Sequence, residues 1–225
     1  IGLNQCLENL SNFLSNKIKT LRIISLFLFI CESIGCGLEF PSPPPNTFYK
    51  YNELKVGRGP VYLLTVDLNL DGFSDLVSAN AENNTLSVLL SKGDGRFKKK
   101  LTFPVASEPT TITTGDINGD NIPDLLINSR GAGQITILLG YGNGSFRRLP
   151  GVKTGKVPLA IIPADFNGDE KLDVAVTLTF DKMEIFLGSG NGAFKKGETY
   201  PTGSRPFSGV PADFNGDGNI DIALA

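Results

Sequence analysis

Short apolar runs separated by Gly, Asn and Pro succeed one another from about residue 56 to residue 225, and none follows a helical period. The first of them span residues 61–66, 76–79, 85–90 and 97–105. The series returns at residues 112–115, 125–127 and 134–139 and in a segment after Phe146. Runs of this length between turn residues predict β-strands, four to each unit.

A nine-residue acidic pattern recurs four times between these runs. It has Asp at positions 1, 5 and 9 and Asn at position 3, and its copies start 49, 49 and 48 residues apart. We name the copies loop one (67–75), loop two (116–124), loop three (165–173) and loop four (213–221). Their acidic and amide residues are Asp67, Asn69, Asp71, Asp75, Asp116, Asn118, Asp120, Asp124, Asp165, Asn167, Asp169, Asp173, Asp213, Asn215, Asp217 and Asp221.

The repeat period predicts the fold class. About 49 residues with four short strands match one blade of a β-propeller, which is a four-stranded antiparallel sheet. The chain holds three such units and the start of a fourth. We therefore predict an all-β protein built of propeller blades. We also expect it to be a fragment of a larger propeller, because such rings close with about 4 to 8 blades.

The chemistry of the loops favours calcium. Alternate positions of a tight loop can turn inward together, and Ca²⁺ accepts mixed carboxylate, amide and carbonyl oxygens. The loops hold no Cys or His, which argues against zinc and copper. Of the 14 Asp in the chain, 12 stand in these loops. Apart from these 12, the chain has 11 acidic residues, Asp and Glu together, and it has 21 Lys and Arg. Carboxylates gathered in this way repel one another, so a bound cation would also stabilise the fold.

Two other interpretations of the loops were weighed. Asn-Gly and Asp-Gly favour turns without any metal, but four copies in register that keep every Asp and Asn favour a ligand. An EF-hand would need Glu at position 12 and flanking helices. This chain has flanking strands, and position 12 is Ser78, Ile127, Val176 and Leu224.

Two further markers share the period. A Gly-x-Gly-x-Phe turn ends at Phe97, Phe146 and Phe194, and a proline stands seven residues before each loop, at Pro60, Pro109, Pro158 and Pro206. The glycines permit the positive φ of tight hairpins, and we expect the Phe side chains to pack between blades.

In this order the three markers resemble the FG-GAP and VCBS repeats of integrin-type β-propellers, over about residues 55–225. The resemblance implies that each loop joins two adjacent strands and holds calcium through its Asp and Asn. It also implies that position 7 lends a backbone carbonyl, from Phe73, Ile122, Lys171 and Asn219. Position 6 is Gly72 and Gly218 in two loops but Asn121 and Glu170 in the others. Because Glu tolerates the left-handed region poorly, loop three should bind most weakly.

Basic residues follow each Phe, as Lys98–Lys100, Arg147–Arg148 and Lys195–Lys196. Lys on an outer strand protects a sheet edge from pairing, which is the simpler explanation. The other explanation is a periodic cationic surface for acidic glycans or another anionic partner. Nucleic acid is not expected, because few aromatic residues interleave with the basic ones and the pI is 5.3.

The N-terminal region differs from the repeats. Lys17, Lys19 and Arg22 precede a nine-residue apolar run, residues 23–31, which is too short to span a bilayer but fits a secretory signal. Residues 33–37 resemble a degenerate bacterial lipobox, which would make Cys36 a lipidation site. A plain cleaved signal and an uncleaved anchor are the alternatives. We divide the chain into a signal or lipoprotein-like segment (1–36), a Pro-rich linker (37–55) and the repeats (56–225).

These observations predict a secreted or surface-anchored calcium-binding scaffold for adhesion or recognition, with an unidentified protein or glycan ligand. The alternative is a propeller that is part of a polysaccharide-acting lyase or hydrolase. The chain has no His and no Cys after residue 36, so it lacks the commonest general base and any thiol nucleophile in the repeats. We therefore expect no catalytic residues and no enzymatic activity in this chain.

Overall fold

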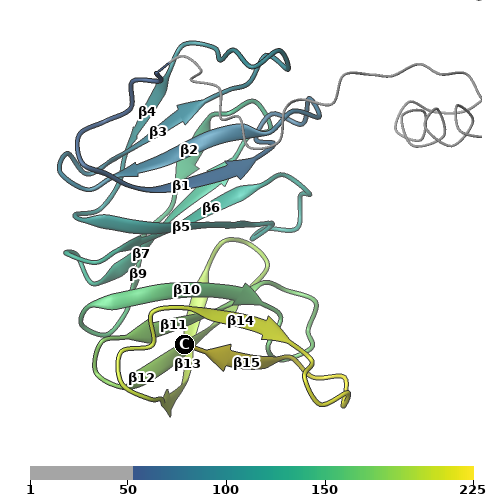
Figure 1. Ribbon diagram of the computed structural model, residues 1–225. Coiled ribbons are helices and arrows are strands. Elements are labelled where there is room, and N and C mark those ends of the chain that lie inside the picture. The colour runs from purple at the N-terminus through teal and green to yellow at the C-terminus, as the bar shows by residue number, and fades with distance from the viewer. Residues whose placement is uncertain (1–52) are drawn as a thin grey trace, which may run out of the picture. The chain divides into compact units, whose positions relative to one another are not determined.

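The computed structural model describes residues 53–225, in which every regular element is a β-strand (Figure 1). Residues 54–225 form one compact unit. The predicted signal segment, the lipidation site at Cys36 and most of the predicted linker lie outside the described residues. Within residues 53–225 there is no helix that could cross a membrane.

The strands form four antiparallel sheets in chain order. The first sheet contains β1 (Pro60–Val66), β2 (Asp75–Asn80), β3 (Thr85–Leu89) and β4 (Leu101–Pro104). The second contains β5 (Pro109–Gly115), β6 (Asp124–Ser129), β7 (Gln134–Gly140), β8 (Phe146–Arg148) and β9 (Val152–Lys153). The third contains β10 (Pro158–Ala164), β11 (Asp173–Leu178), β12 (Lys182–Gly188) and β13 (Phe194–Pro201), and the fourth contains β14 (Gly209–Ala212) and β15 (Asp221–Leu224).

Successive sheets pack face to face, with their first strands adjacent. Strand β1 contacts β5, β5 contacts β10, and β10 contacts β14, and Figure 1 shows these four strands one below another. Strands within each sheet pair in simple up-and-down order, from an inner first strand to an outer last one. This is the blade arrangement of a propeller. The predicted architecture of three blades plus part of a fourth is confirmed.

The core lies between neighbouring sheets. The middle strands β2, β3, β6, β7 and β11 are buried almost throughout. For the strands of the second and third sheets a neighbouring sheet lies on each face, whereas the first sheet packs on the second through one face. Strand β6 shows the period of two: Leu125 and Ile127 belong to the cluster shared with the first sheet, and Leu126 to the cluster shared with the third. Such burial on both faces explains why these strands read as continuous apolar runs rather than as alternating ones.

The Phe residues of the glycine turns occupy the expected place in two cases. Phe146 packs against the core between the first two sheets, with its ring edge-on to Phe103 at a centroid distance of 5.2 Å. Phe194 packs against the cluster between the second and third sheets. Phe97 is partly buried and lies outside the three core clusters of the described residues.

Two outer strands are shorter than the apolar runs predicted. Strand β4 begins only at Leu101, because the lysines after Phe97 leave the ladder, and Phe97 makes an isolated bridge to Ser91. In the second sheet, Pro150 lacks the backbone N–H that a ladder needs. The outer strand is accordingly interrupted there, and β8 and β9 pair with opposite ends of β7.

A recurring backbone feature had no predicted counterpart. The residue before each of the four prolines is left-handed, with φ of 64° at Gly59, 52° at Glu108, 57° at Val157 and 51° at Arg205. In the first three sheets the carbonyl of this residue accepts an N–H from the residue after the second strand (Ala81, Arg130 and Thr179). Only the first copy uses glycine, so the tertiary hydrogen bond holds Glu108 and Val157 in a conformation that their residue types disfavour.

Candidate metal loops

Each acidic loop joins the first and second strands of its sheet, as the resemblance implied. Loop one runs from the end of β1 to the start of β2, where Val66 is paired with Asp75. The same closing pair occurs in the other sheets, as Gly115 with Asp124, Ala164 with Asp173 and Ala212 with Asp221. Position 9 is therefore both the last loop residue and the first residue of a strand.

The position 9 carboxylates connect each loop to the body of its blade. Asp75, Asp124 and Asp173 are fully buried. One oxygen of Asp124 accepts the N–H of Ile117 at 2.9 Å and the other accepts the N–H of Gly140, at the end of β7, at 2.7 Å. The equivalent bonds are Leu68 and Ser91 to Asp75, Phe166 and Gly188 to Asp173, and Phe214 to Asp221. These side chains hold the loop closed even without an ion.

The carboxylate at position 1 is surrounded by N–H groups of its own loop. In loop two, Asp116 accepts from Gly119 at 2.7 Å, from Asp120 at 3.1 Å and from Asn121 at 2.7 Å. The bond from position 6 occurs in all four loops. The carboxylate of position 1 is therefore held in one orientation by the backbone of its own loop.

Positions 3 and 5 repeat a second set of bonds. The Oδ1 of the position 5 Asp accepts the N–H of position 7 at 2.8–3.1 Å in all four loops. The amide oxygen of the position 3 Asn accepts the N–H of position 5 at 2.8–3.3 Å. The four loops therefore share one conformation, although their intervening residues differ.

Ionisation differs between the exposed and the buried carboxylates. The N–H groups of Gly218 and Gly216 lower the pKa of Asp213. Burial raises the pKa of Asp124, against the hydrogen bonds from Gly140 and Ile117, and the neighbouring charges of Asp120 and Asp116 raise it further. Asp173 shows the same pattern, with burial as the largest cause. The loop carboxylates thus repel one another, and a cation between them would remove that repulsion.

Two positions of each loop need a left-handed backbone. Position 6 has φ of 86° at Gly72, 61° at Asn121 and 63° at Glu170, which confirms that Glu170 stands where its residue type is disfavoured. Position 4 has φ of 73–79° at its glycines in loops two to four, but in loop one it is Leu70 with φ of 58°. Loop one also lacks the bond from the position 4 N–H that the other three loops make to position 1. Position 4 carried no prediction from the sequence, although Leu70 replaces the Gly of the other three loops.

Loop three carries a further handicap. The Nζ of Lys171, at position 7, lies 3.1 Å from a carboxylate oxygen of Asp169 at position 5. This hydrogen bond is the first cause of the lowered pKa of Asp169. An ammonium group already paired with a predicted ligand would compete with a metal ion, so weak binding by loop three stays a prediction.

The donor set fits a hard divalent cation. Every loop offers carboxylates at positions 1, 5 and 9 and an amide oxygen at position 3, which are the donors that Ca²⁺ takes at flexible geometry. Within residues 53–225 no three acidic, Cys or His side chains are gathered closely enough to form a ready metal cluster. Because the carboxylates are turned toward N–H groups of the backbone, binding would require their side chains to rotate inward or carbonyl oxygens to complete the shell.

The family comparison agrees with this repeat geometry. A model of the FG-GAP-like repeat matches residues 67–127, 116–176 and 165–224, and each match runs from one acidic loop to just beyond the next. The chain belongs to the FG-GAP-like repeat family. No curated protein matches the chain closely enough to be counted as a relative.

Several solved structures resemble these FG-GAP-like repeats at low identity. BBS1N in complex with ARL6DN is 16% identical with a TM-score of 0.49, and the match covers 72% of this chain and 47% of that one. The Photorhabdus luminescens Tc holotoxin pore is 24% identical with a TM-score of 0.48, covering 72% and 8%. The V. cholerae biofilm matrix protein Bap1 is 20% identical with a TM-score of 0.43, covering 74% and 28%. The chain thus spans less than half of each of these proteins, and these likenesses carry no information on its ligand.

Proposed function

We propose that this FG-GAP-like repeat protein is a calcium-binding β-propeller scaffold for adhesion or recognition, secreted or held at a cell surface. The repeats would be its binding body. The N-terminal region would direct export, with Cys36 as its point of lipid attachment. The ligand would be a protein or a glycan, and the chain itself would not be an enzyme.

The observation that carries the calcium proposal is the fourfold repetition of one loop conformation around the same oxygen donors. A metal ligand must be deprotonated, and the N–H groups of Gly218 and Gly216 lower the pKa of Asp213 at position 1 of loop four. The residues that would hold the ion in loop two are Asp116, Asn118, Asp120 and Asp124, with the carbonyl of Ile122. Equivalent residues would serve in the other three loops.

Calcium bound there would offset the repulsion among three carboxylates and fix the connection between the inner two strands of a blade. The chain's own residues supply the rest of the site. The buried position 9 carboxylate ties the loop to the end of the third strand, as Asp124 does through Gly140. A loop fixed at both ends presents its neighbours in one arrangement, which is the property required of a recognition surface. Extracellular calcium modules with Kd of about 10⁻⁴ to 10⁻³ M suit this role.

The decisive experiment is thermal unfolding of the full chain in millimolar calcium, in excess chelator and in millimolar magnesium. We expect calcium alone to raise Tm, because magnesium dehydrates reluctantly and prefers a stricter octahedron. A variant with Asp120, Asp169 and Asp217 all changed to Asn should lose most of the rise. An equal rise with both ions would make the loops unselective cation sites, and no rise with either ion in a folded protein would reduce them to polar turns.

A further inference from the structure

The outer strands of the second and third sheets border a groove that plays no part in the metal loops. Its volume is about 610 Å³, which lies within the range of small-ligand sites, roughly 300–1,000 Å³. One wall is the interrupted outer strand β8–β9 and the other is β13 with the turn that precedes it. At Pro150 the outer strand stops pairing with β7, and the groove lies beside this interruption at residues 149–151.

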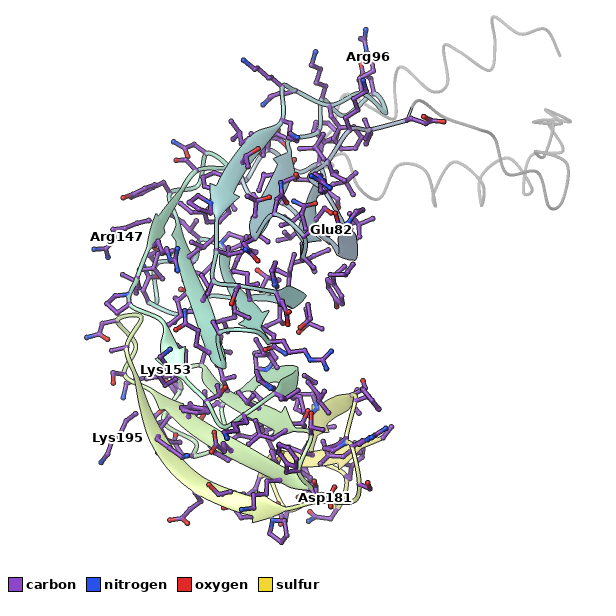
Figure 2. The ribbon with its side chains drawn as sticks, turned by 90° about the vertical axis from the view of Figure 1, so that its left-hand side faces the viewer. Glu82, Arg96, Arg147, Lys153, Asp181 and Lys195 are labelled. Atoms are coloured by element: carbon purple, nitrogen blue, oxygen red, sulfur yellow. The ribbon has the colours of Figure 1, made fainter. Side chains whose placement is uncertain are left out.

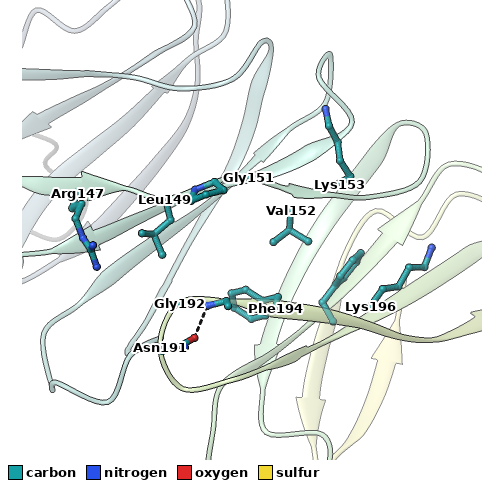
Figure 3. Close-up of a pocket in the computed structure, with 12 residues that line it drawn as sticks. Arg147, Leu149, Gly151, Val152, Lys153, Asn191, Gly192, Phe194 and Lys196 are labelled. Atoms are coloured by element: carbon teal, nitrogen blue, oxygen red, sulfur yellow. Dashed lines mark hydrogen bonds between the residues drawn. The ribbon is translucent and has the colours of Figure 1, made fainter.

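The lining combines apolar and cationic side chains (Figure 3). Leu149, Val152 and Phe194 are half-buried, and Arg147, Lys153 and Lys196 stand around them. No Asp or Glu lines the groove. Figure 2 shows Arg147, Lys153 and Lys195 on one side of the repeats, with the acidic Glu82 and Asp181 on the opposite side.

Two of the three lining cations carry charge that no carboxylate offsets. The Nζ of Lys196 lies 2.5 Å from a carboxylate oxygen of the nearly buried Glu184, so that pair is neutral. Arg147 and Lys153 form no ion pair with any residue in the range 53–225, and both are exposed. Protection of a sheet edge accounts for basic residues on both walls, because both are outer strands. It does not require that these residues flank a hollow lined by Leu149, Val152 and Phe194.

From this arrangement we propose that the groove between the second and third sheets binds an acidic oligosaccharide. A sugar ring has an apolar face of C–H groups that can lie on Phe194 and Val152, while its carboxylates or sulfates reach Arg147 and Lys153. A guanidinium group matches a carboxylate with two parallel hydrogen bonds. Single-stranded nucleic acid would need a series of exposed aromatic rings, and Phe194 is the only partly exposed ring in this lining.

The proposal rests on the recognition part of the proposed function and not on calcium. It is tested by titrating the full chain with oligogalacturonate, and with the same oligosaccharide methyl-esterified to remove its charge, by calorimetry. The test variant is Arg147→Ser with Lys153→Ser. The control is Lys98→Ser with Lys99→Ser, which removes the same charge from exposed positions of the first sheet. Melting curves check that both variants fold.

We expect the charged oligosaccharide to bind and its ester to bind more weakly. The test variant should lose roughly tenfold in affinity, because two solvent-exposed ion pairs disappear, and the control less than about twofold. Equal losses in both variants, no binding by the wild type, or tighter binding of a single-stranded oligonucleotide would each overturn the proposal. Titrations in calcium and in chelator separate this proposal from the calcium proposal. If the oligosaccharide binds to a protein whose Tm does not change with calcium, the groove proposal stands and only the calcium proposal fails.

Discussion

Asp124 and Asp120 stand four residues apart in loop two but should serve different purposes. Asp124 is fully buried and accepts N–H groups from both Ile117 and Gly140, whereas Asp120 is exposed and bonds only within its own loop. Changing each to Asn keeps the shape of the side chain and removes one oxygen. The pair of substitutions therefore separates the structural role of the loop from its metal role.

The expected magnitudes differ between the two positions. In Asp124→Asn the new amide group faces one of the two buried N–H groups, and a buried donor left without a partner costs about 1–3 kcal/mol. For a unit of this size about 2 kcal/mol lowers Tm by roughly 4–8 °C. Asp120→Asn should change the free energy of unfolding by less than about 0.5 kcal/mol in chelator, as is usual for an exposed site. It should instead remove the gain from calcium, about 1.4 kcal/mol for one site at free calcium tenfold above Kd.

The assay is thermal unfolding of the full chain and both variants, in chelator and in calcium, followed by circular dichroism. Asp124→Asn should melt lower in chelator, and Asp120→Asn should melt like the wild type there but gain less from calcium. Asn118→Ser, which keeps an oxygen at position 3, is the matched control for Asp120. The reasoning fails if Asp124→Asn melts with the wild type in chelator. It fails equally if Asp120→Asn keeps the full calcium gain.

Three more outcomes follow from the backbone and the charges. Val157→Gly should raise the free energy of unfolding, measured by urea titration, by about 1 kcal/mol, because it removes the strain of a β-branched residue at φ 57°. Gly59→Val, the reverse change at the equivalent position, should lower the free energy of unfolding. Lys171→Ala should strengthen calcium binding by loop three by freeing Asp169, and Lys182→Ala, outside the loop, should leave it unchanged in calorimetry. Because the pKa values of Asp124 and Asp173 are raised in the folded protein, these groups stabilise it at low pH, and this contribution is lost as the pH rises through the folded-state pKa. Calcium binds the ionised form of the same carboxylates. The calcium-dependent rise in Tm should therefore shrink as pH falls toward that pKa, which melts at a series of pH values would reveal.

The 49-residue period and the oxygen donors of the acidic loops are both visible in the sequence. Local rules suffice for the strands, because β-branched and apolar runs between Gly and Pro can form little else. They suffice also for the loop conformation, since Asp and Asn side chains bond to N–H groups two to five residues away. The inner strands of the first two sheets therefore lie where the apolar runs predicted them, whereas the outer strand of the first sheet begins at Leu101 and not at residue 97.

Tertiary structure alone decided what each of these residues does. That Asp124 is a buried connection as well as a predicted ligand depends on the N–H of Gly140, at the end of β7, which it accepts at 2.7 Å. The left-handed Val157 depends on the hydrogen bond from Thr179 across the first two strands of its blade. The groove between β8–β9 and β13 exists only because two sheets pack face to face around a strand that Pro150 interrupts. The period of the sequence predicts the blades, but no local pattern tells which residue elsewhere in the blade contacts Asp124 or Val157.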